Sequence, residues 1–437
     1  MIAMSLTPAS DASRRDFLKT STVISTTSAL AASFGGNARA FAAEDDVLKV
    51  GLVGCGGRGS GAALQALRAD SQTKLVAMGD AFEDNLERSL KNLKATDDIA
   101  AQVEVDEDHQ FVGLDAYQKV IDAVDVVLLA SPPGFRPQHL MAAVEAGKHI
   151  FTEKPMATDF GGAKLAMEAV RKAEGNGKAM VAGFCWRYDT PRRELFQRMA
   201  DGQIGDIRTV YGTYLTGPVK PMPTAETRPE GLTDLEWMVR NWYNFCFLSG
   251  DGLVEQACHT VDWLMWTMGD VPPVSCTAVG GRQIPAHGGN IFDHIEVNYL
   301  WDNGTRGFLA QRQIPGCHNE NYLDVLGTQG AGQIRGRVSI EGASPWRFKG
   351  DNNDMYQTEH NEMFASIRAG APINDGARMM TSTIAAIMGR EAAYTGKQLT
   401  WEQAMSSEQM LIPSDLHDWS TTVDVRPTPR PGVTPFV

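Results

Sequence analysis

Three side chains able to transfer protons stand at helical spacing in one segment, at Glu255, His259 and Asp262. Positions i, i+4 and i+7 project from one face of an α-helix, so we expect the three side chains to lie together. A carboxylate one turn from an imidazole orients the ring and raises its basicity, and histidine titrates where a general base works. The spacing therefore predicts a catalytic pair in which Glu255 orients His259 as a general base.

Two other interpretations of the same segment stay open. Carboxylate and imidazole groups on one helical face also bind zinc, but no fourth ligand is evident nearby, and we assign no metal. The three groups also fit a buried polar network that ties the helix to a sheet. For Asp262 alone we favour this structural interpretation.

A second set of residues has the spacing of a dinucleotide-binding loop, G-x-G-x-x-G. It consists of Gly54, Cys55, Gly56, Gly57, Arg58 and Gly59. The first glycine permits a tight turn, the second lets the backbone approach a pyrophosphate, and the third lets helix and strand pack closely. A glycine-rich turn without a ligand is the alternative.

The choice of dinucleotide depends on Asp80, which ends the next apolar run. Its carboxylate would accept hydrogen bonds from the adenosine ribose hydroxyls and repel a 2′-phosphate. Ala81 follows, and there is no adjacent arginine to receive such a phosphate. The sequence therefore predicts NAD rather than NADP.

The elements around this loop alternate between strand and helix. Apolar runs at 48–53, 74–78 and 124–130 are typical of strands buried on both faces, and a further strand is expected at 179–184. Helical patterns lie at 61–67, 85–93, 139–146 and 160–174. This alternation predicts a doubly wound parallel sheet, the Rossmann architecture, over residues 44–188.

The pattern of polar and apolar residues changes after residue 188. Polar residues alternate with aromatic and β-branched ones at 207–216, 294–301 and 306–313, as in an antiparallel sheet with one open face. Helical stretches are expected at 253–268 and 359–369. We therefore predict an α/β chain whose second domain, 189–425, is α+β and carries the substrate site. A Pro-rich extended tail follows at 426–437, and the open sheet face suits a homodimer or homotetramer.

Composition excludes several classes of function. The 437 residues include 53 acidic and 40 basic side chains, a net charge of −13, which disfavours nucleic acid and anionic membranes as partners. No apolar stretch is long enough to span a bilayer. The six cysteines are scattered and form no C-x-x-C pair, so we expect most of them to be buried as small apolar side chains.

The first 43 residues are expected to be a targeting segment and its linker. The sequence SRRDFLK at 13–19 resembles a twin-arginine signal, a soft apolar stretch follows at 20–34, and Ala38-Arg39-Ala40 offers a cleavage site. The interpretation predicts export by the twin-arginine machinery, a periplasmic location and a mature chain beginning near Phe41. Because that machinery moves folded proteins, we also expect a tightly held cofactor.

A further run connects the chain to a known family. Ser131 and Pro132 follow the apolar run 124–130, His139 comes next, and residues 146–155 read AGKHIFTEKP. This order resembles the Gfo/Idh/MocA family of nicotinamide-dependent sugar and cyclitol oxidoreductases, and the similarity extends over nearly the whole mature chain.

The resemblance implies roles for individual residues. Lys154 would lie at the nicotinamide ribose and the substrate hydroxyl, and His259 would be the base that takes the alcohol proton. Ser131, Pro132 and His139 would belong to the cofactor cleft, and Glu153 would shape the turn that carries Lys154. Glu255 stands where the family usually has aspartate, which leaves the identity of the sugar open.

Other candidates for the substrate side come from residue type alone. Arg187 and Tyr188 follow a predicted strand and would reach the nicotinamide end, with a structural salt bridge as the alternative for Arg187. Trp242 offers a flat aromatic face for a sugar, and Arg312 and His318 bracket a strand end and would bind substrate hydroxyls.

These residues together favour hydride transfer between a sugar-like secondary alcohol and NAD. Two alternatives use the same fold. One is an enzyme that cleaves a glycoside by oxidising the sugar transiently, and the other is a sugar-binding protein that keeps NAD without catalysis.

Overall fold

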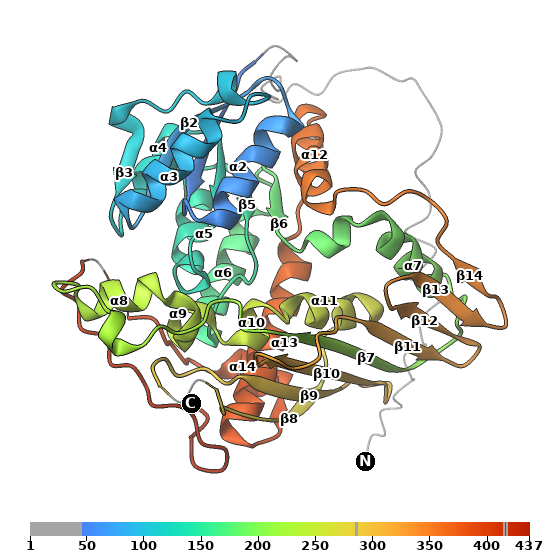
Figure 1. The fold of residues 1–437 in the computed structure, drawn as a ribbon. Helices are drawn as coiled ribbons and strands as arrows, with labels where there is room; N and C mark the ends of the chain where they lie inside the picture. The colour runs from blue at the N-terminus through green and yellow to red at the C-terminus, as the bar shows by residue number, and fades with distance from the viewer. Residues whose placement is uncertain (1–45, 285–286, 414–415, 417) are drawn as a thin grey trace, which may run out of the picture. The chain divides into compact units, whose positions relative to one another are not determined.

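The computed structural model describes residues 46–284, 287–413, 416 and 418–437 (Figure 1). The predicted targeting segment, 1–43, lies outside the described residues. No described helix is both long enough and apolar enough to cross a bilayer.

The first half forms the predicted parallel sheet, with strand order β3-β2-β1-β4-β5-β6. Its strands are β1 (Leu48–Val53), β2 (Thr73–Asp80), β3 (Gln110–Val112), β4 (Val126–Leu129), β5 (His149–Thr152) and β6 (Met180–Ala182). Its helices are α2 (Gly57–Ala69), α3 (Glu83–Lys94), α4 (Ala116–Ala123), α5 (Arg136–Glu145) and α6 (Phe160–Ala173). Every residue of β4 and β5 is buried, which explains why the apolar run at 124–130 identified β4, whereas β3 and β5 were not predicted. The Rossmann prediction is confirmed.

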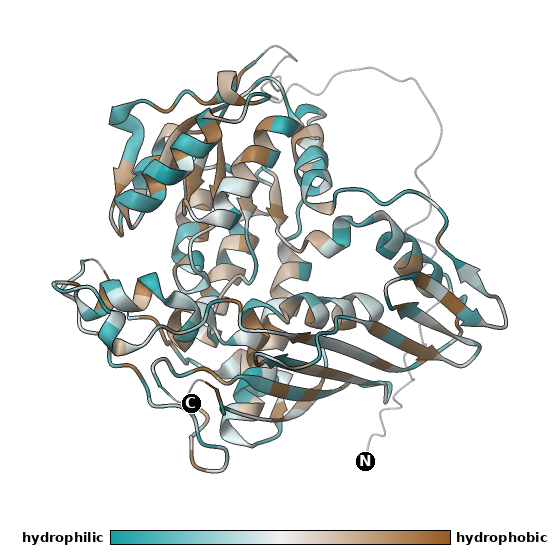
Figure 2. Cartoon of the chain, in the orientation of Figure 1, coloured by the Kyte–Doolittle hydropathy of each residue, from teal (hydrophilic) through white to brown (hydrophobic). Residues whose placement is uncertain are grey.

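The second half builds a nine-stranded sheet of order β14-β13-β12-β11-β7-β10-β9-β8-β15. Its strands are β7 (Ile207–Thr216), β8 (Ser275–Gly281), β9 (His294–Leu300), β10 (Arg306–Gln313), β11 (Leu323–Gly327), β12 (Gly330–Ile334), β13 (Val338–Gly342), β14 (Trp346–Arg347) and β15 (Leu399–Thr400). The sheet is mostly antiparallel as predicted, but β7 and β10 run parallel to each other. Figure 2 shows hydrophilic and hydrophobic segments mixed along these strands.

One face of this sheet packs against helices that lie between it and the nucleotide domain, among them α11 (Cys258–Thr267; Figure 1). Gly212 of β7 allows the contact, because a Cβ there would stand 2.4 Å from Cγ2 of Thr260. The residues that face the helices alternate along each strand, so Tyr214 on β7 and its register partner Gln311 on β10 share this face.

Residues 253–268 do not form the single predicted helix. The segment divides into α10 (Gly252–Glu255) and α11, and the amide of Ala257 bonds to the carbonyl of Gly252, five residues back. A turn of this kind holds one extra residue, so Glu255 and His259 no longer stand one regular turn apart. The break also frees the carbonyl of Glu255 from the helix ladder, since the amide of His259 bonds to Gln256 instead.

Several helices escaped prediction or extend further than expected. These are α7 (Thr190–Ala200), α8 (Asp234–Arg240), α9 (Cys246–Ser249), α12 (Met355–Arg368), α13 (Gly376–Thr395) and α14 (Trp401–Ser406). Helix α12 lies beside α2 (Figure 1), and its Met363, Phe364 and Ile367 join the apolar core of the parallel sheet. A segment from the second half of the chain therefore completes the nucleotide domain.

The last residues lack regular secondary structure and include a turn in which the amides of Val433 and Thr434 bond to the carbonyl of Arg430. Residues 426–437 contain neither helix nor strand, and the amide of Gly432 bonds to the carbonyl of Thr395 at the end of α13. Five cysteines are buried as expected, and Cys317 is exposed.

Candidate active site

The glycine loop has the geometry of a dinucleotide cradle. Gly54 has a φ of +93°, and a Cβ at Gly59 would stand 1.9 Å from the carbonyl oxygen of Gly54. Gly56 and Gly57 have open space where a Cβ would be, so their backbone is accessible to a ligand at the start of α2. The loop thus fits a pyrophosphate at the helix N-terminus.

A pocket extends from this loop along the carboxyl ends of β1, β2 and β4. Besides the glycines it is lined by Arg58, Asp80, Phe82, Asn85, Ser131, Pro132, Phe135, His139, Val239 and Trp242. Asp80 accepts hydrogen bonds from the amides of Cys55 (2.6 Å) and Phe82 (2.9 Å), which fixes its carboxylate at the edge of the pocket. The adenosine half of a dinucleotide would lie here.

His139 acts within the wall of this pocket rather than as a charged group. Its Nδ1 lies 3.0 Å from Oγ of Ser131, and its ring stacks on Tyr117 at 4.0 Å. Burial, together with the charge of Arg136, lowers the pKa of His139 to about 3, so the ring stays neutral. Ser131 and His139 thereby form one neutral hydrogen-bonded surface toward the cofactor.

The freed end of α10 meets the lysine of the Glu-Lys-Pro turn. Nζ of Lys154 donates to the backbone carbonyl of Glu255 and to its Oε1 at 3.0 Å. Oε2 of Glu255 accepts from Gln256 (2.7 Å), whose Oε1 accepts from the hydroxyl of Tyr214 (2.6 Å). Both carboxylate oxygens of Glu255 are therefore engaged, and the predicted contact that would orient His259 is absent among the described residues. Glu255 holds Lys154 instead.

The charge state of Lys154 follows from this pairing. Burial, the largest single effect, would lower the pKa of its ammonium, but the charge and hydrogen bond of Glu255 together with Cys258 and Glu153 outweigh burial and raise the pKa above its ordinary value. Lys154 is a fixed cation at the carboxyl end of β5. Glu153, the preceding residue, forms an ion pair with Arg58 of the glycine loop, with Nε and Oε1 3.1 Å apart.

His259 lies beside this pair in an aromatic setting. The centre of its ring is 4.8 Å from that of Trp186 and 6.0 Å from that of Phe184. Its Nδ1 is buried with no hydrogen-bond partner among the described residues. Burial and the charge of Lys154 lower the pKa of His259 well below the ordinary value, so its imidazole is neutral and able to accept a proton.

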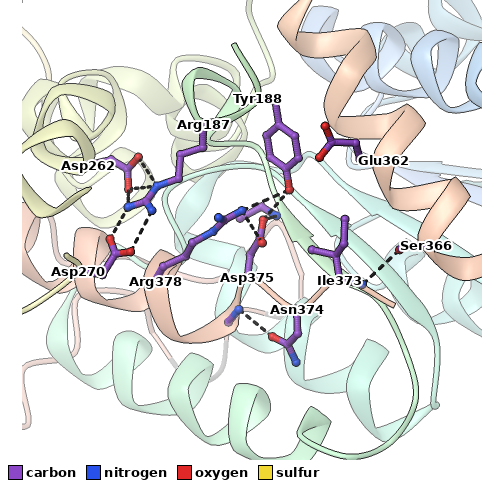
Figure 3. Close-up of polar contacts among 12 residues, drawn as sticks. Arg187, Tyr188, Asp262, Asp270, Glu362, Ser366, Ile373, Asn374, Asp375 and Arg378 are labelled. Atoms are coloured by element: carbon purple, nitrogen blue, oxygen red, sulfur yellow. Dashed lines mark hydrogen bonds and ion pairs between the residues drawn. The ribbon is translucent and has the colours of Figure 1, made fainter. Parts of the chain in front are cut away.

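Arg187 and Tyr188 are held by nearby carboxylates (Figure 3). The guanidinium of Arg187 is held by Asp262, with Nε and Nη2 each 2.8 Å from a carboxylate oxygen, and by Asp270. The hydroxyl of Tyr188 donates to Asp375 at 3.0 Å, and both side chains are buried. The predicted contacts of these two side chains with cofactor and substrate are wrong, because nearby carboxylates accept their hydrogen bonds. Asp262, which also accepts from Ser382, has the structural role that the sequence favoured.

Breaking this buried pair has a predictable cost. We expect Asp262→Asn to lower the free energy of unfolding by about 3 kcal/mol, because a buried guanidinium loses its main counter-charge. Urea unfolding followed by circular dichroism measures the change. Asp206→Asn is the matched control, since its pair with Arg208 is exposed and worth at most about 1 kcal/mol. Equal losses in the two variants would contradict the assignment.

The remaining substrate candidates lie elsewhere. Trp242 lines the nucleotide pocket near Asp80, on the adenosine side. Arg312 points to the face of β10 opposite Gln311, where its guanidinium meets the carbonyl of His318. His318 itself is exposed. The structure does not bring these three residues to Lys154.

Sequence reasoning missed residues on the helix-facing side of the large sheet. Gln311 is buried, and neither polar atom of its amide has a hydrogen-bond partner among the described residues. Oγ1 of Thr216 also lacks one. Gln311 approaches Gly252 of α10 so closely that a Cβ there would stand 2.8 Å from its Nε2. The alternation along β10 was visible in the sequence, but which of its two faces meets the site was not.

Comparisons with known proteins agree with this architecture. Residues 48–183 match the family described as "Oxidoreductase family, NAD-binding Rossmann fold", and residues 193–332 match the "GFO/IDH/MocA C-terminal domain". The chain is 34% identical over 161 residues to inositol 2-dehydrogenase 4 of Saccharopolyspora erythraea, a match covering 36% of this chain and 42% of the relative. It is 24% identical over 362 residues to inositol 2-dehydrogenase of Rhizobium meliloti, covering 78% and 96%.

Most of these curated relatives are matched over about half of their length. Among solved structures, levoglucosan dehydrogenase in complex with NADH and levoglucosan superposes with a TM-score of 0.63 at 18% identity, covering 81% of this chain and 99% of that one. At this identity the likeness concerns the fold.

Proposed function

Because the chain belongs to the Gfo/Idh/MocA oxidoreductase family and has its NAD-binding domain, we propose that it transfers hydride between NAD and a secondary alcohol of a sugar or cyclitol. The observation that carries the proposal is the buried ammonium of Lys154, held by Glu255 beside a neutral His259. Relatives named inositol 2-dehydrogenase support the substrate class.

Each of these side chains has a defined part in the proposed reaction. NAD, when bound, supplies the hydride acceptor. Lys154 donates a hydrogen bond to the reacting oxygen and stabilises negative charge on it. His259, being neutral, takes the hydroxyl proton, and its low pKa makes the return of that proton easy in the reverse direction. Glu255 keeps Lys154 charged and in place, through its side chain and its freed carbonyl.

The adenosine end of the pocket is built to retain the cofactor. The guanidinium of Arg240 lies 3.9 Å from the ring centre of Phe82, and the ring of Trp419 stacks on Phe82 at 5.1 Å. Arg240 also pairs with Asp84 at 3.0 Å. Helix α8 and the C-terminal segment thus brace the strand end that carries Asp80, which supports a slowly dissociating cofactor.

We expect Trp419→Ala to speed NAD dissociation by about 2- to 10-fold, the worth of one aromatic pair. Displacement of bound NAD by a fluorescent analogue, followed by stopped flow, measures the rate. Trp401→Ala, at a half-buried tryptophan on α14, is the control and should leave the rate unchanged. An unchanged rate in Trp419→Ala would mean that the stack does not retain the cofactor.

The same retention fits the export proposed from the sequence. A periplasmic enzyme has no free pool of nicotinamide, so a bound NAD would be reduced by one sugar and reoxidised by another in place. The outer face of the large sheet, with half-buried Tyr211 and Phe308, would join a second copy of the chain in a homodimer or homotetramer.

The test begins with the exported, purified protein. After denaturation, mass spectrometry of the supernatant is expected to show one NAD per chain, and a sugar panel should then reduce the bound NAD. NADP in place of NAD would overturn the role given to Asp80. A protein that is empty and binds no added dinucleotide would overturn the proposed function.

A further inference from the structure

A second cavity lies beside the site, on the same face of the large sheet. It has a volume of about 630 Å³ and lies between the start of α7, the turn joining β12 to β13, strand β14 and the loop before α12. Its polar lining consists of Asp189, Arg192, Asn321, Arg337, Arg347, Asn352, Asn353, Asp354 and Tyr356. The volume falls in the range of small-molecule sites.

Two of its lining residues connect this cavity to the proposed reaction centre. The guanidinium of Arg192 lies 5.3 Å from the ring centre of Trp186, the same ring that packs against His259. On the other side, Arg58 of the glycine loop lies 4.8 Å from the ring centre of Tyr356. The Trp186 ring therefore lies between this cavity and His259, and a substrate with more than one ring is needed to occupy both places.

The charge of the cavity is opposite to that of the protein. Arg337 and Arg347 are exposed and form no ion pair within the described part of the chain, although the net charge of the whole protein is −13. The lining carboxylates are already engaged, because Asp189 pairs with Arg192 and Asp354 caps α12. The two free guanidinium groups are thus left to attract an anion.

We propose that this cavity is a subsite for the distant part of an acidic saccharide, a substrate in which one ring is oxidised and a second ring carries a carboxylate. The proposal rests on the proposed sugar oxidoreductase function and narrows its substrate class. Arg337 and Arg347 would bind the carboxylate, and the amides of Asn321 and Asn352 would bind ring hydroxyls. Specificity would then lie in a ring that takes no part in the chemistry.

Binding measured without turnover tests this proposal. Matched pairs of gluco-, galacto- and manno-configured disaccharides, neutral or with a uronate as the outer ring, are titrated calorimetrically into the protein loaded with NADH, which cannot accept a hydride from them. In at least one pair the uronate is expected to bind about 5- to 10-fold more tightly than the neutral sugar at low salt, as exposed charge-assisted hydrogen bonds allow. The preference should shrink as salt is added.

Substitutions locate the preference in the cavity. Arg337→Gln combined with Arg347→Gln should abolish it while leaving the affinity for the neutral partner unchanged. Arg306→Gln, which removes an exposed arginine at the start of β10 outside the cavity, should preserve it. The proposal is overturned if no pair shows a preference, or if the double variant keeps it. A uronate preference in a protein that oxidises no sugar would retain the subsite and reject the proposed function.

Discussion

Lys154→Met is expected to lower kcat/KM for alcohol oxidation by about 10²- to 10³-fold, the usual effect of removing one hydrogen-bond donor from a developing oxyanion. NAD content should stay at one per chain, because Lys154 lies outside the lining of the adenosine half of the pocket. The measurement is the rate at which substrate reduces the bound NAD, with the cofactor content determined on the same sample.

The variant has a structural side effect that must be separated from chemistry. Without the ammonium, the carboxylate of Glu255 is left buried and unpaired, which is itself destabilising. Combining Lys154→Met with Glu255→Gln removes that charge, so the double variant should recover stability while its activity stays low. Lys164→Met, at a lysine near the protein surface, should be fully active. Recovered activity in the double variant would show that Lys154 is only a structural counter-ion.

Much of the nucleotide half followed from local pattern. Apart from the exposed Lys49, residues 48–53 are apolar because β1 is buried, and the glycine spacing reflects contacts that no side chain tolerates, such as that of Gly59 with the carbonyl of Gly54. Constraints of this kind lie within a few residues of one another. A single sequence therefore shows them directly.

The catalytic segment was harder, because its geometry depends on tertiary contacts. The pattern 255–259–262 is that of a regular helix, but the extra residue near Ala257 turns Glu255 away from His259. The carbonyl of Glu255 that this break frees accepts a hydrogen bond from Lys154, about a hundred positions earlier in the chain. No periodicity within the segment carries that information.

Arg187 shows the same limit for charged residues. An arginine binds a cofactor or a carboxylate equally well. Here the fold brings Asp262 and Asp270 to Arg187, and their carboxylates bind its guanidinium. Arg337 and Arg347 show the reverse case. Their positions in the sequence do not distinguish them from other arginines. They are distinguished by the cavity that they line and by the absence of a carboxylate partner among the described residues.

His259→Ala is expected to lower kcat for alcohol oxidation by about 10²- to 10⁴-fold, the range for loss of a general base. The ring has no hydrogen-bond partner at its Nδ1 among the described residues, so its loss leaves no buried charge unpaired. The free energy of unfolding should therefore fall only by the cost of the cavity that the missing ring leaves beside Trp186 and Phe184. His318→Ala, at an exposed histidine, is the control and should keep full activity.

The pH dependence distinguishes this base from an ordinary histidine. An unperturbed imidazole becomes protonated below pH 6.5, and oxidation that depends on it falls about tenfold per pH unit. Because burial and the charge of Lys154 lower the pKa of His259 well below that value, the ring stays neutral as the pH falls through 6.5. The rate of alcohol oxidation in the wild-type protein should therefore be flat across this window and fall only at more acidic pH. A wild-type profile that bends near 6.5, and loses the bend in His259→Ala, would show that the imidazole is solvated in the working enzyme and that the buried arrangement is not the reactive one.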